Sequence, residues 1–309
     1  MFLRLTGCSI LMKSFTAVLS LLTLLSFLPA NGQDEGVEII PTKITDTLYL
    51  LQGKGGNIGL SIGDDGPLMI DDQFAPLSEK IMATVATLSD QSIRFVINTH
   101  WHGDHTGGNE NLGKAGAIIV AHENVRVRMS KGQFMKAFNR HVNPAPEAAL
   151  PVVTFPQSMT IHWNGDELAI DHLSSAHTDG DAVIHFKKAN VLHTGDLFFN
   201  GFYPFVDASS GGSFAGLLNA LNSLAERIDD ETVIIPGHGP LAKKADLLRY
   251  ITMLETVQAT IGDLIEQGQT KEEIIAAKPT AEFDADWGGG FLAPDIWVGI
   301  VYDAMVVGE

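Results

Sequence analysis

The chain has 309 residues, of which 45% are hydrophobic and 18% are charged. This composition is sufficient for a full hydrophobic core, and it excludes an intrinsically disordered chain. The net charge of −17 repels phosphate backbones and anionic lipid, so nucleic acid is not expected as a partner.

The first predicted element is a secretory signal peptide over residues 1–32. Lys13 precedes the apolar run Phe15–Leu28, which only Ser and Thr interrupt, and Ala30-Asn31-Gly32 has the small-x-small pattern of a cleavage site. A membrane anchor is the alternative, but the run is shorter than the ~20 apolar residues that a spanning helix needs. We therefore expect a periplasmic or secreted protein with no membrane span after cleavage. Cleavage also removes Cys8, the only cysteine, so the mature chain has no disulfide.

Residues 37–309 are predicted to form a single domain in which short apolar runs alternate with helical stretches. Apolar runs bounded by turn residues predict strands at Leu48–Leu51, Ile58–Ile62, Leu68–Ile70, Ile93–Ile97, Ala117–Val120, Val152–Phe155, Thr160–Trp163, Leu168–Leu173, Ala182–Phe186, Val191–Leu192 and Thr232–Ile235. Helical spacing predicts helices at Ser78–Leu88, Asn124–His141, Phe214–Ile228, Leu241–Gln267, Lys271–Ala277 and Pro294–Val306. Strands and helices in two successive sets indicate an α/β fold whose sheets carry helices on the outside.

Four side chains that can bind metal follow one predicted strand within six residues: His100, His102, Asp104 and His105. The spacing of His100 and His102 places both side chains on one face of extended backbone. Gly103 permits a sharp turn, after which Asp104 and His105 can point toward a second ion. Chance is a poor explanation, because the whole chain has only 11 histidines. The spacing therefore predicts two metal ions rather than one closed four-ligand site.

Three later residues that can bind metal, His177, Asp196 and His238, each come shortly after a predicted strand. Residues placed just past strand ends gather at one edge of a sheet system, where functional sites usually lie. Each of the three signals is weak alone, since a Pro-Gly-His-Gly sequence is commonly a turn. Together with the first cluster, they are expected to complete the site.

These motifs resemble those of the metallo-β-lactamase superfamily. The His-x-His-x-Asp-His sequence at residues 100–105 resembles its signature, and His177, Asp196 and His238 resemble its three later motifs in the same order. The resemblance spans about residues 45–240. It implies an α/β fold of the four-layer αβ/βα sandwich type, that is, the metallo-β-lactamase fold.

The resemblance also implies a site for two zinc ions. It assigns His100, His102 and His177 to the first ion, Asp104, His105 and His238 to the second, and Asp196 to both ions or to the second. Imidazole and carboxylate ligands suit zinc, and the family's di-iron members have Glu where this chain has His102. Asp71 resembles a family acid that orients a ligand histidine through a hydrogen bond.

Hydrolysis is the expected chemistry. Zinc lowers the pKa of bound water to about 7, so a metal-bound hydroxide is expected to act as nucleophile. Asp104 is expected to orient this hydroxide and to pass a proton to the leaving atom, and Asn200 is expected to donate to a developing oxyanion. Aromatic residues of Leu197–Phe205 are expected either to line an apolar substrate pocket or to pack in the core. The glycine-rich segment Gly53–Gly59 is predicted to form a mobile hairpin over the site.

The partner is expected to be a small-molecule substrate, and three readings compete for its class. The favoured one is a cyclic amide, with a β-lactam as the named class. The best-known β-lactamase subclass has Cys at the position of Asp196 and a drug-binding Lys three residues later, where this chain has Phe199. The cations that can replace that Lys are Lys54, Arg126, Arg128 and Arg140. The second reading is a lactone or another carboxylic ester or thioester, since hydroxyacylglutathione hydrolases share the bridging aspartate. The third is a periplasmic protein that binds metal without catalysis.

Overall fold

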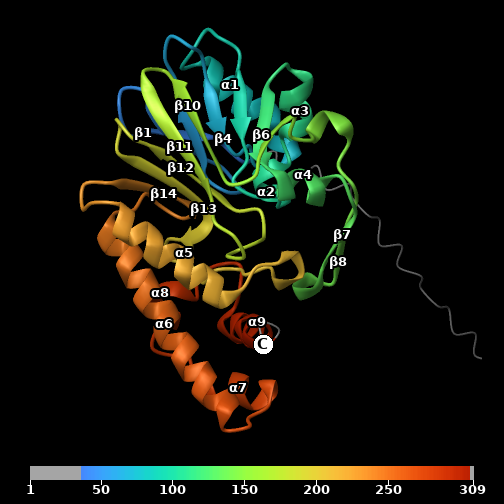
Figure 1. Cartoon of the computed structure of the whole chain (residues 1–309), viewed down its shortest axis with the longest axis vertical. Helices are drawn as coiled ribbons and strands as arrows, with labels where there is room; N and C mark the ends of the chain where they lie inside the picture. The colour runs from blue at the N-terminus through green and yellow to red at the C-terminus, as the bar shows by residue number, and fades with distance from the viewer. Residues whose placement is uncertain (1–35, 307–309) are drawn as a thin grey trace, which may run out of the picture. The chain divides into compact units, whose positions relative to one another are not determined.

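Two β-sheets packed face to face form the centre of the structure (Figure 1). The computed structural model describes residues 36–306, so the predicted signal peptide lies outside the described residues. Within this range, the strand order of the first sheet is β1 (Ile40–Lys43), β2 (Leu48–Gln52), β3 (Ile58–Ser61), β4 (Leu68–Ile70), β5 (Phe95–Ile97), β6 (Ile118–His122) and β9 (Val153–Phe155). The order of the second is β10 (Ser158–Trp163), β11 (Asp166–His172), β12 (Ala182–Phe186), β13 (Val191–Phe199) and β14 (Val233–His238). Strands β4, β5, β6 and β9 are mutually parallel, as are β13 and β14.

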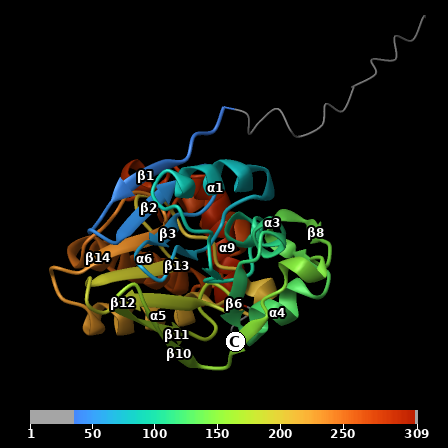
Figure 2. The ribbon, with the colours of Figure 1, turned by 90° about the horizontal axis from the view of Figure 1, so that it is seen from above.

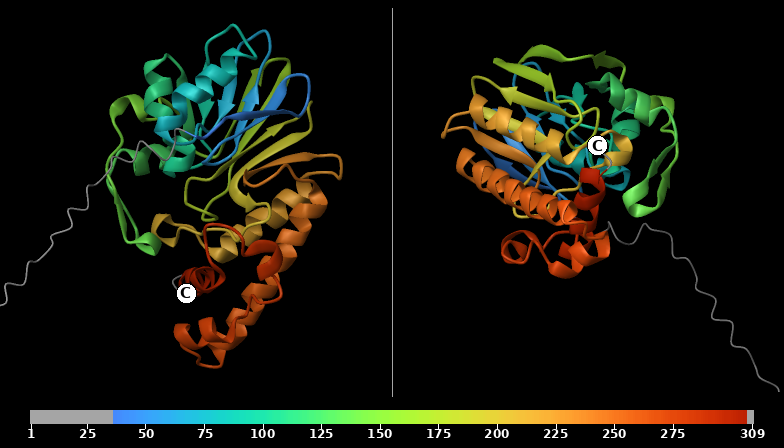
Figure 3. Two further views of the ribbon diagram at one scale, coloured as in Figure 1. Left: turned by 180° about the vertical axis from the view of Figure 1, so that it is seen from behind. Right: turned by 60° about the horizontal axis from the view of Figure 1, so that its bottom comes forward.

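Helices cover the outer face of each sheet (Figures 2 and 3). The helices on the side of the first sheet are α1 (Ser78–Ala86), α3 (Asn109–Lys114) and α4 (Glu123–Met129). Those on the side of the second sheet are α5 (Phe214–Arg227), α6 (Lys244–Glu266), α7 (Lys271–Ala277), α8 (Asp284–Trp287) and α9 (Pro294–Val306). The resulting order of layers is helices, sheet, sheet, helices, which confirms the four-layer αβ/βα sandwich.

Apolar side chains fill the three spaces between these layers. Leu68 and Ile70 of β4 pack between the sheets against Ile184 of β12, and all three are fully buried. Met69 of β4 points the opposite way, toward Ile81 of α1. Alternate residues of one strand thus serve two cores, which explains why Leu68–Ile70 is an unbroken apolar run. Each such side chain contributes roughly 1.5–3 kcal/mol on full burial.

One predicted helix is wrong over two thirds of its length. The helix expected over Asn124–His141 ends at Met129, and the chain then forms a separate hairpin of β7 (Gln133–Met135) and β8 (Arg140–Val142). Its turn is the 3₁₀ helix η3 (Lys136–Phe138), which ends at Asn139 in the left-handed conformation, with φ 46°. Asn tolerates this conformation better than most residues. The hairpin projects beyond the two sheets (Figure 1).

Strand β13 is longer than the sequence indicated. We predicted a strand at Val191–Leu192, whereas the extended backbone continues to Phe199 and is buried throughout. It places Asp196 inside a strand rather than past its end. No helix among residues 36–306 is long and apolar enough to cross a membrane.

Candidate metal centre

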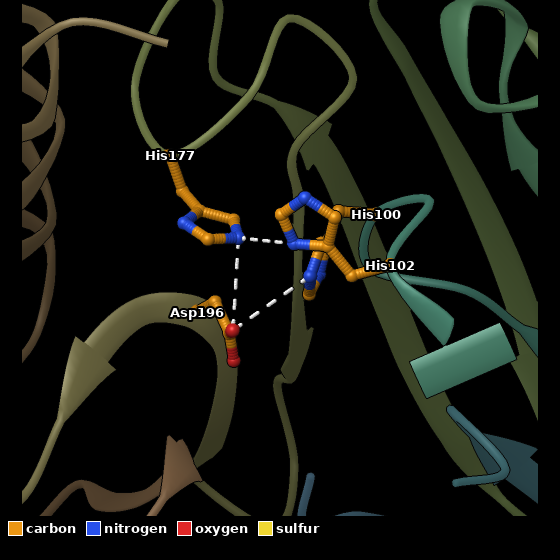
Figure 4. Close-up of side chains that lie close together, drawn as sticks. All are labelled: His100, His102, His177 and Asp196. Atoms are coloured by element: carbon orange, nitrogen blue, oxygen red, sulfur yellow. Dashed lines mark hydrogen bonds and ion pairs between the residues drawn. The ribbon is translucent and has the colours of Figure 1, made fainter. Parts of the chain in front are cut away.

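The seven predicted metal ligands form two groups that share one carboxylate. The first group is His100, His102, His177 and Asp196, and the second is Asp104, His105, Asp196 and His238. Within each group the candidate ligand atoms lie within 4.8 Å of one another. Figure 4 shows the first group, with its three imidazole rings around the Asp196 carboxylate.

The two oxygens of Asp196 face different groups. Its Oδ2 lies 3.7 Å from His100 Nε2 and 3.6 Å from His177 Nε2. Its Oδ1 lies 3.0 Å from His105 Nε2 and 3.3 Å from His238 Nε2. One carboxylate therefore serves both groups, which is the arrangement that a ligand shared between two cations requires.

The first cluster of ligands divides between the groups because the backbone changes direction after His102. His102 is extended, with φ −65° and ψ 148°, and the short helix α2 (Gly103–Thr106) begins directly after it. Asp104 and His105 therefore point to the second group, as expected. Gly103 is not the reason, because its φ is not positive and a Cβ placed on it would have no neighbour within 4 Å.

Two carboxylates fix the outer nitrogens of ligand histidines. Asp71 Oδ2 accepts from His105 Nδ1 at 2.7 Å, which confirms the predicted role of Asp71. Asp71 has φ 62°, and its carboxylate also accepts from the backbone N–H and the hydroxyl of Thr99. Asp207 Oδ2 accepts from His102 Nε2 at 3.1 Å. Such partners select one tautomer and hold the ring in place.

The two other rings of the first group are fixed by neutral acceptors. His177 Nδ1 donates to the carbonyl oxygen of Phe205 at 2.7 Å. His100 Nδ1 lies 3.0 Å from the Thr99 hydroxyl, which itself donates to Asp71. Each imidazole of the first group therefore turns one nitrogen outward as a donor and leaves the other as a lone pair facing inward.

The inward-facing atoms fit a bound cation. His102 Nδ1 and His177 Nε2 are 2.9 Å apart, and both are acceptors when their outer nitrogens carry the protons. His100 Nε2 is buried and has no hydrogen-bond partner among the described residues. Buried lone pairs that converge without donors are costly unless a cation compensates them. Imidazole nitrogen and carboxylate oxygen are ligands that zinc prefers.

The acids and histidines of the second group shift one another's pKa values. Burial lowers the pKa of His238, but the carboxylates of Asp196 and Asp104 outweigh it and raise the pKa to about 9. Burial raises the pKa of Asp104, yet His105 and the hydrogen bond from His238 lower it to about 2. The carboxylates and imidazoles of the second group are therefore electrostatically coupled, and a divalent cation bound between the carboxylates would take the place of the protons on the two histidines.

A cavity of about 470 Å³ opens over both groups. His102, Asp104, Asp196 and His238 form its floor, and Asp104 keeps 28% of its side chain exposed. Apolar residues form much of its wall, including Phe74, Met129, Met135, Phe138, Phe205 and Phe291. Pockets of this size bind small molecules.

The model of the Metallo-beta-lactamase superfamily matches residues 55–238, which is more than half of the chain and includes every candidate ligand. The chain belongs to this superfamily. Its members are metal-dependent hydrolases, so the chain is a superfamily hydrolase with His and Asp metal-binding groups.

Relatives within the superfamily differ in activity. The chain is 25% identical over 163 residues to the hydroxyacylglutathione hydrolase GloC of Haemophilus influenzae, covering 52% of this chain and 76% of that protein. It is 20% identical over 241 residues to the metallo-beta-lactamase type 2 of Bacteroides fragilis, covering 74% and 90%. These two relatives have different activities, so the comparison leaves the substrate open.

Solved structures show the same fold. A metallo-beta-lactamase from Pontibacter korlensis aligns with a TM-score of 0.58 at 20% identity, over 71% of this chain and 99% of that one. The sec-alkylsulfatase Pisa1 from Pseudomonas sp. aligns with a TM-score of 0.63 at 18% identity, over 86% of this chain and 50% of that one.

The structure contradicts the role predicted for Asn200. Its side-chain amide donates to the carbonyl oxygen of Pro240 at 3.0 Å and lies 3.5 Å from that of Leu241. Its backbone N–H donates to His238 O. Asn200 therefore holds the loop after a metal ligand of this superfamily hydrolase, and its amide protons are not directed at a substrate.

The aromatic segment after Asp196 divides between the two expected roles. Phe198 and Tyr203 are buried in the core with the helices. Phe205 lines the cavity, and its ring lies against His102 at 5.8 Å. Phe199 stacks on His238 with ring centroids 5.0 Å apart. At the position where the best-known β-lactamase subclass has a Lys, this superfamily member thus has a ring that supports a metal ligand.

The Gly53–Gly59 segment is hydrogen-bonded to residues next to the candidate metal ligands. The backbone N–H of Gly56 donates to Asp104 O, and Gly56 O accepts from Gln73 Nε2 at 2.7 Å. The side-chain amide of Asn57 donates to the carbonyl oxygens of Pro236 and Gly239, on either side of His238. These bonds place the segment beside the second ligand group, and its mobility stays a prediction.

Three orienting roles in the site were missed in the sequence, although Phe205 belongs to the aromatic segment singled out there. Asp207 and Phe205 orient His102 and His177 from a loop without a motif, and Thr99 joins His100 to Asp71. Of these three roles, only that of Thr99 could have been suspected from the sequence, because Thr99 stands directly before the first ligand, His100. Asp207 lies 105 positions from its partner, and nothing local distinguishes it from a turn residue.

Proposed function

We propose that this superfamily member is an exported dizinc hydrolase of a small acyl compound. The observation that carries the proposal is the pair of ligand groups sharing Asp196 on the floor of an open cavity. His100, His102 and His177 would hold one ion, and Asp104, His105 and His238 the other, with Asp196 between them. Zinc bound there supplies a Lewis acid for a carbonyl oxygen and lowers the pKa of water to about 7.

The protein's own residues contribute positioning and proton transfer. Asp104 is the catalytic acid–base candidate, because it is ionised and is the most exposed carboxylate on the cavity floor. Its carboxylate can take a proton from the attacking water and give it to the leaving atom. Asp71 and Asp207 hold His105 and His102 against rotation, which keeps the reacting geometry fixed.

A β-lactam is the first candidate substrate. The cavity combines apolar walls with cations, as an anionic bicyclic amide would require, and Arg128 and Arg140 are both among its lining residues. Two of the four cations proposed from the sequence, Lys54 and Arg126, do not line it. The bond cleaved would be the amide C–N bond, with the proton from Asp104 going to the nitrogen.

A carboxylic ester or thioester is the second candidate. The favouring observation is Asp196 itself, whose two oxygens face both ligand groups in place of the Cys of the best-known β-lactamase subclass. The relative GloC is a hydroxyacylglutathione hydrolase, which agrees with an Asp at this position. In this case the leaving atom would be oxygen or sulfur.

A hydrolysis panel on the zinc-loaded protein separates these candidates. Nitrocefin and a carbapenem represent the amides, and an aryl ester, a lactone and S-lactoylglutathione represent the esters and thioesters. We expect kcat/KM on the order of 10⁴ M⁻¹s⁻¹ or more for one class, with loss in His102→Ala. Lys114→Gln, on the far exposed end of α3, serves as the variant that should keep activity. Zinc binding without turnover of any acyl substrate would favour a non-catalytic metal binder and overturn the proposal.

Export is a separate part of the proposal and has its own test. We propose that residues 1–32 direct the chain to the periplasm or the medium and are then removed. N-terminal sequencing of protein recovered from periplasmic and medium fractions should begin near residue 33. Recovery of the full-length chain from the cytoplasm alone would overturn it.

A further inference from the structure

The β7–β8 hairpin places positive charge on one side of the catalytic cavity. Three of the chain's 20 Lys and Arg residues line this cavity: Arg128, Lys131 and Arg140. The only carboxylates among its lining residues are Asp104 and Asp196, which belong to the metal groups. This local positive charge contrasts with the net charge of −17 of the whole chain. The contrast indicates that the cavity binds an anionic ligand.

The three cations are not equivalent. Arg128 is paired: its Nε and Nη2 donate to the two oxygens of Asp179 at 2.9 and 2.7 Å, and its Nη1 donates to Gln133. Among residues 36–306, no carboxylate lies within ion-pair distance of the side chains of Lys131 or Arg140. The charge available to a ligand therefore comes from Lys131 and Arg140.

The hairpin that carries Arg140 is held at both ends. At its base, Gln133 Nε2 donates to Arg128 O at 2.9 Å, which ties β7 to the end of α4. At its turn, the ring of Phe138 lies 4.8 Å from that of Phe205, whose carbonyl holds His177. Arg140 follows this turn directly. A fixed support spares the entropy cost of ordering a loop on binding, and it relates the cation to the metal floor in a constant geometry.

We propose that Arg140, assisted by Lys131, binds a carboxylate of the substrate at the hairpin side of the cavity. This inference rests on the proposed acyl hydrolysis and names its substrate class: an acyl compound with a free carboxylate and an apolar middle part. The guanidinium donates two parallel hydrogen bonds to the carboxylate. The apolar part lies along Met135, Phe138 and Phe205, and the scissile carbonyl lies over Asp104 and the metal ligands.

This subsite replaces one that the chain lacks. Phe199 occupies the position that carries a Lys in the best-known β-lactamase subclass, and its ring is buried against His238. An anionic group cannot be recognised there. The hairpin supplies the positive charge instead, from a segment that belongs to neither of the two large sheets.

The test compares two esters with the same leaving group. Mono-4-nitrophenyl glutarate carries a free carboxylate, and 4-nitrophenyl butyrate does not. The zinc-loaded wild type should prefer the anionic ester, and added salt should reduce that preference. In Arg140→Gln the ratio of the two kcat/KM values should fall by roughly 10- to 100-fold, the range of a charged hydrogen bond, chiefly through KM for the anionic ester. Arg140→Lys should restore part of the ratio, and Arg140→Gln with Lys131→Gln should lower it further.

Arg249→Gln is the matched control, because it removes the same charge from an exposed position on α6 outside the cavity. It should leave the ratio unchanged, and thermal melts should show Arg140→Gln folded. An equal rate on both esters in the wild type, or an unchanged ratio in Arg140→Gln, would overturn the subsite while leaving the hydrolase proposal intact. Absence of turnover on every acyl substrate in the wild type would instead overturn the proposed function.

Discussion

Asp207 offers the sharpest test of how the protein prepares its metal site. Its side chain is 2% exposed, and its carboxylate accepts from His102 Nε2 at 3.1 Å, which keeps Nδ1 as the lone pair facing the first group. It also accepts from the hydroxyls of Ser209 and Ser210. In Asp207→Asn the charge is lost, and the amide can present N–H groups that favour the wrong tautomer of His102.

The expected magnitude follows from the bond that is lost. A hydrogen bond to a charged group contributes about 1.5–3 kcal/mol, and replacing such partners of ligand histidines costs 10- to 100-fold in metal affinity. We therefore expect the first zinc ion to bind roughly 10- to 100-fold more weakly in Asp207→Asn. Asp71→Asn should have a similar effect on the second ion, through His105. Ser209→Ala should have a smaller effect than Asp207→Asn, because Ser210 still donates to the carboxylate.

Competition with a chromophoric chelator measures the two zinc dissociation constants, and elemental analysis gives the metal content. Far-ultraviolet circular dichroism establishes that each variant is folded. If folded Asp207→Asn bound both ions with wild-type affinity, the reasoning would be refuted, because the orientation of His102 by this carboxylate would then not contribute to zinc binding. An equal loss at both sites in Asp207→Asn would also refute it, because the Asp207 carboxylate bonds to His102 and to no ligand of the second group.

Three further predictions concern the same molecule. In Gly56→Ala the new Cβ would lie 2.1 Å from His105 Cε1, so the imidazole ring must move, and activity should fall on the order of 100-fold. In the control Gly103→Ala the new Cβ meets nothing within 4 Å, so activity should stay within a few-fold of wild type. Removal of zinc by a chelator should lower Tm by about 8 °C, because saturation at 1,000 times Kd contributes about 4 kcal/mol; a Tm independent of zinc in differential scanning calorimetry would contradict this. Burial and the stacked ring of His122 lower the pKa of His172, so the unfolded chain takes up the proton first and stability should decrease as pH falls below about 6.5. His172→Phe should reduce the difference in Tm between pH 7.5 and pH 5.5, and an unchanged difference would show that this ring does not contribute.

The metal ligands could be predicted from the sequence because their chemistry is local. Residues 100–105 follow a strand end, so spacing alone determined which side chains could share a face. His177 and His238 also lie just beyond or at strand ends, which agrees with the expectation. Asp196 is the exception, since it lies within β13, yet the buried strand still delivers it to the same edge.

The parts that could not be predicted depend on contacts between distant segments. The orienting bond of Asp207 joins positions 105 residues apart, and no periodic pattern encodes it. The amide of Asn200 is satisfied by Pro240 O, a partner visible only after the loop of His238 is folded. The hairpin after Met129 was mistaken for helix, because its residues have no strong β pattern and its turn depends on Asn139 in a left-handed conformation.

Phe199 stands where the best-known β-lactamase subclass has a Lys, and this difference affects both metal binding and the recognition of an anionic substrate. Because the ring of Phe199 stacks on His238, the position three residues after Asp196 supports a candidate metal ligand and offers no charge. A substrate that requires an anionic contact must then find it elsewhere, and Arg140 is a cavity cation without an acidic partner among the described residues. The metal ligands come from strand ends held by two cores, whereas the charge comes from a hairpin outside both sheets. Hydrolysis and substrate choice can therefore change independently in this chain, which is consistent with relatives that differ in activity.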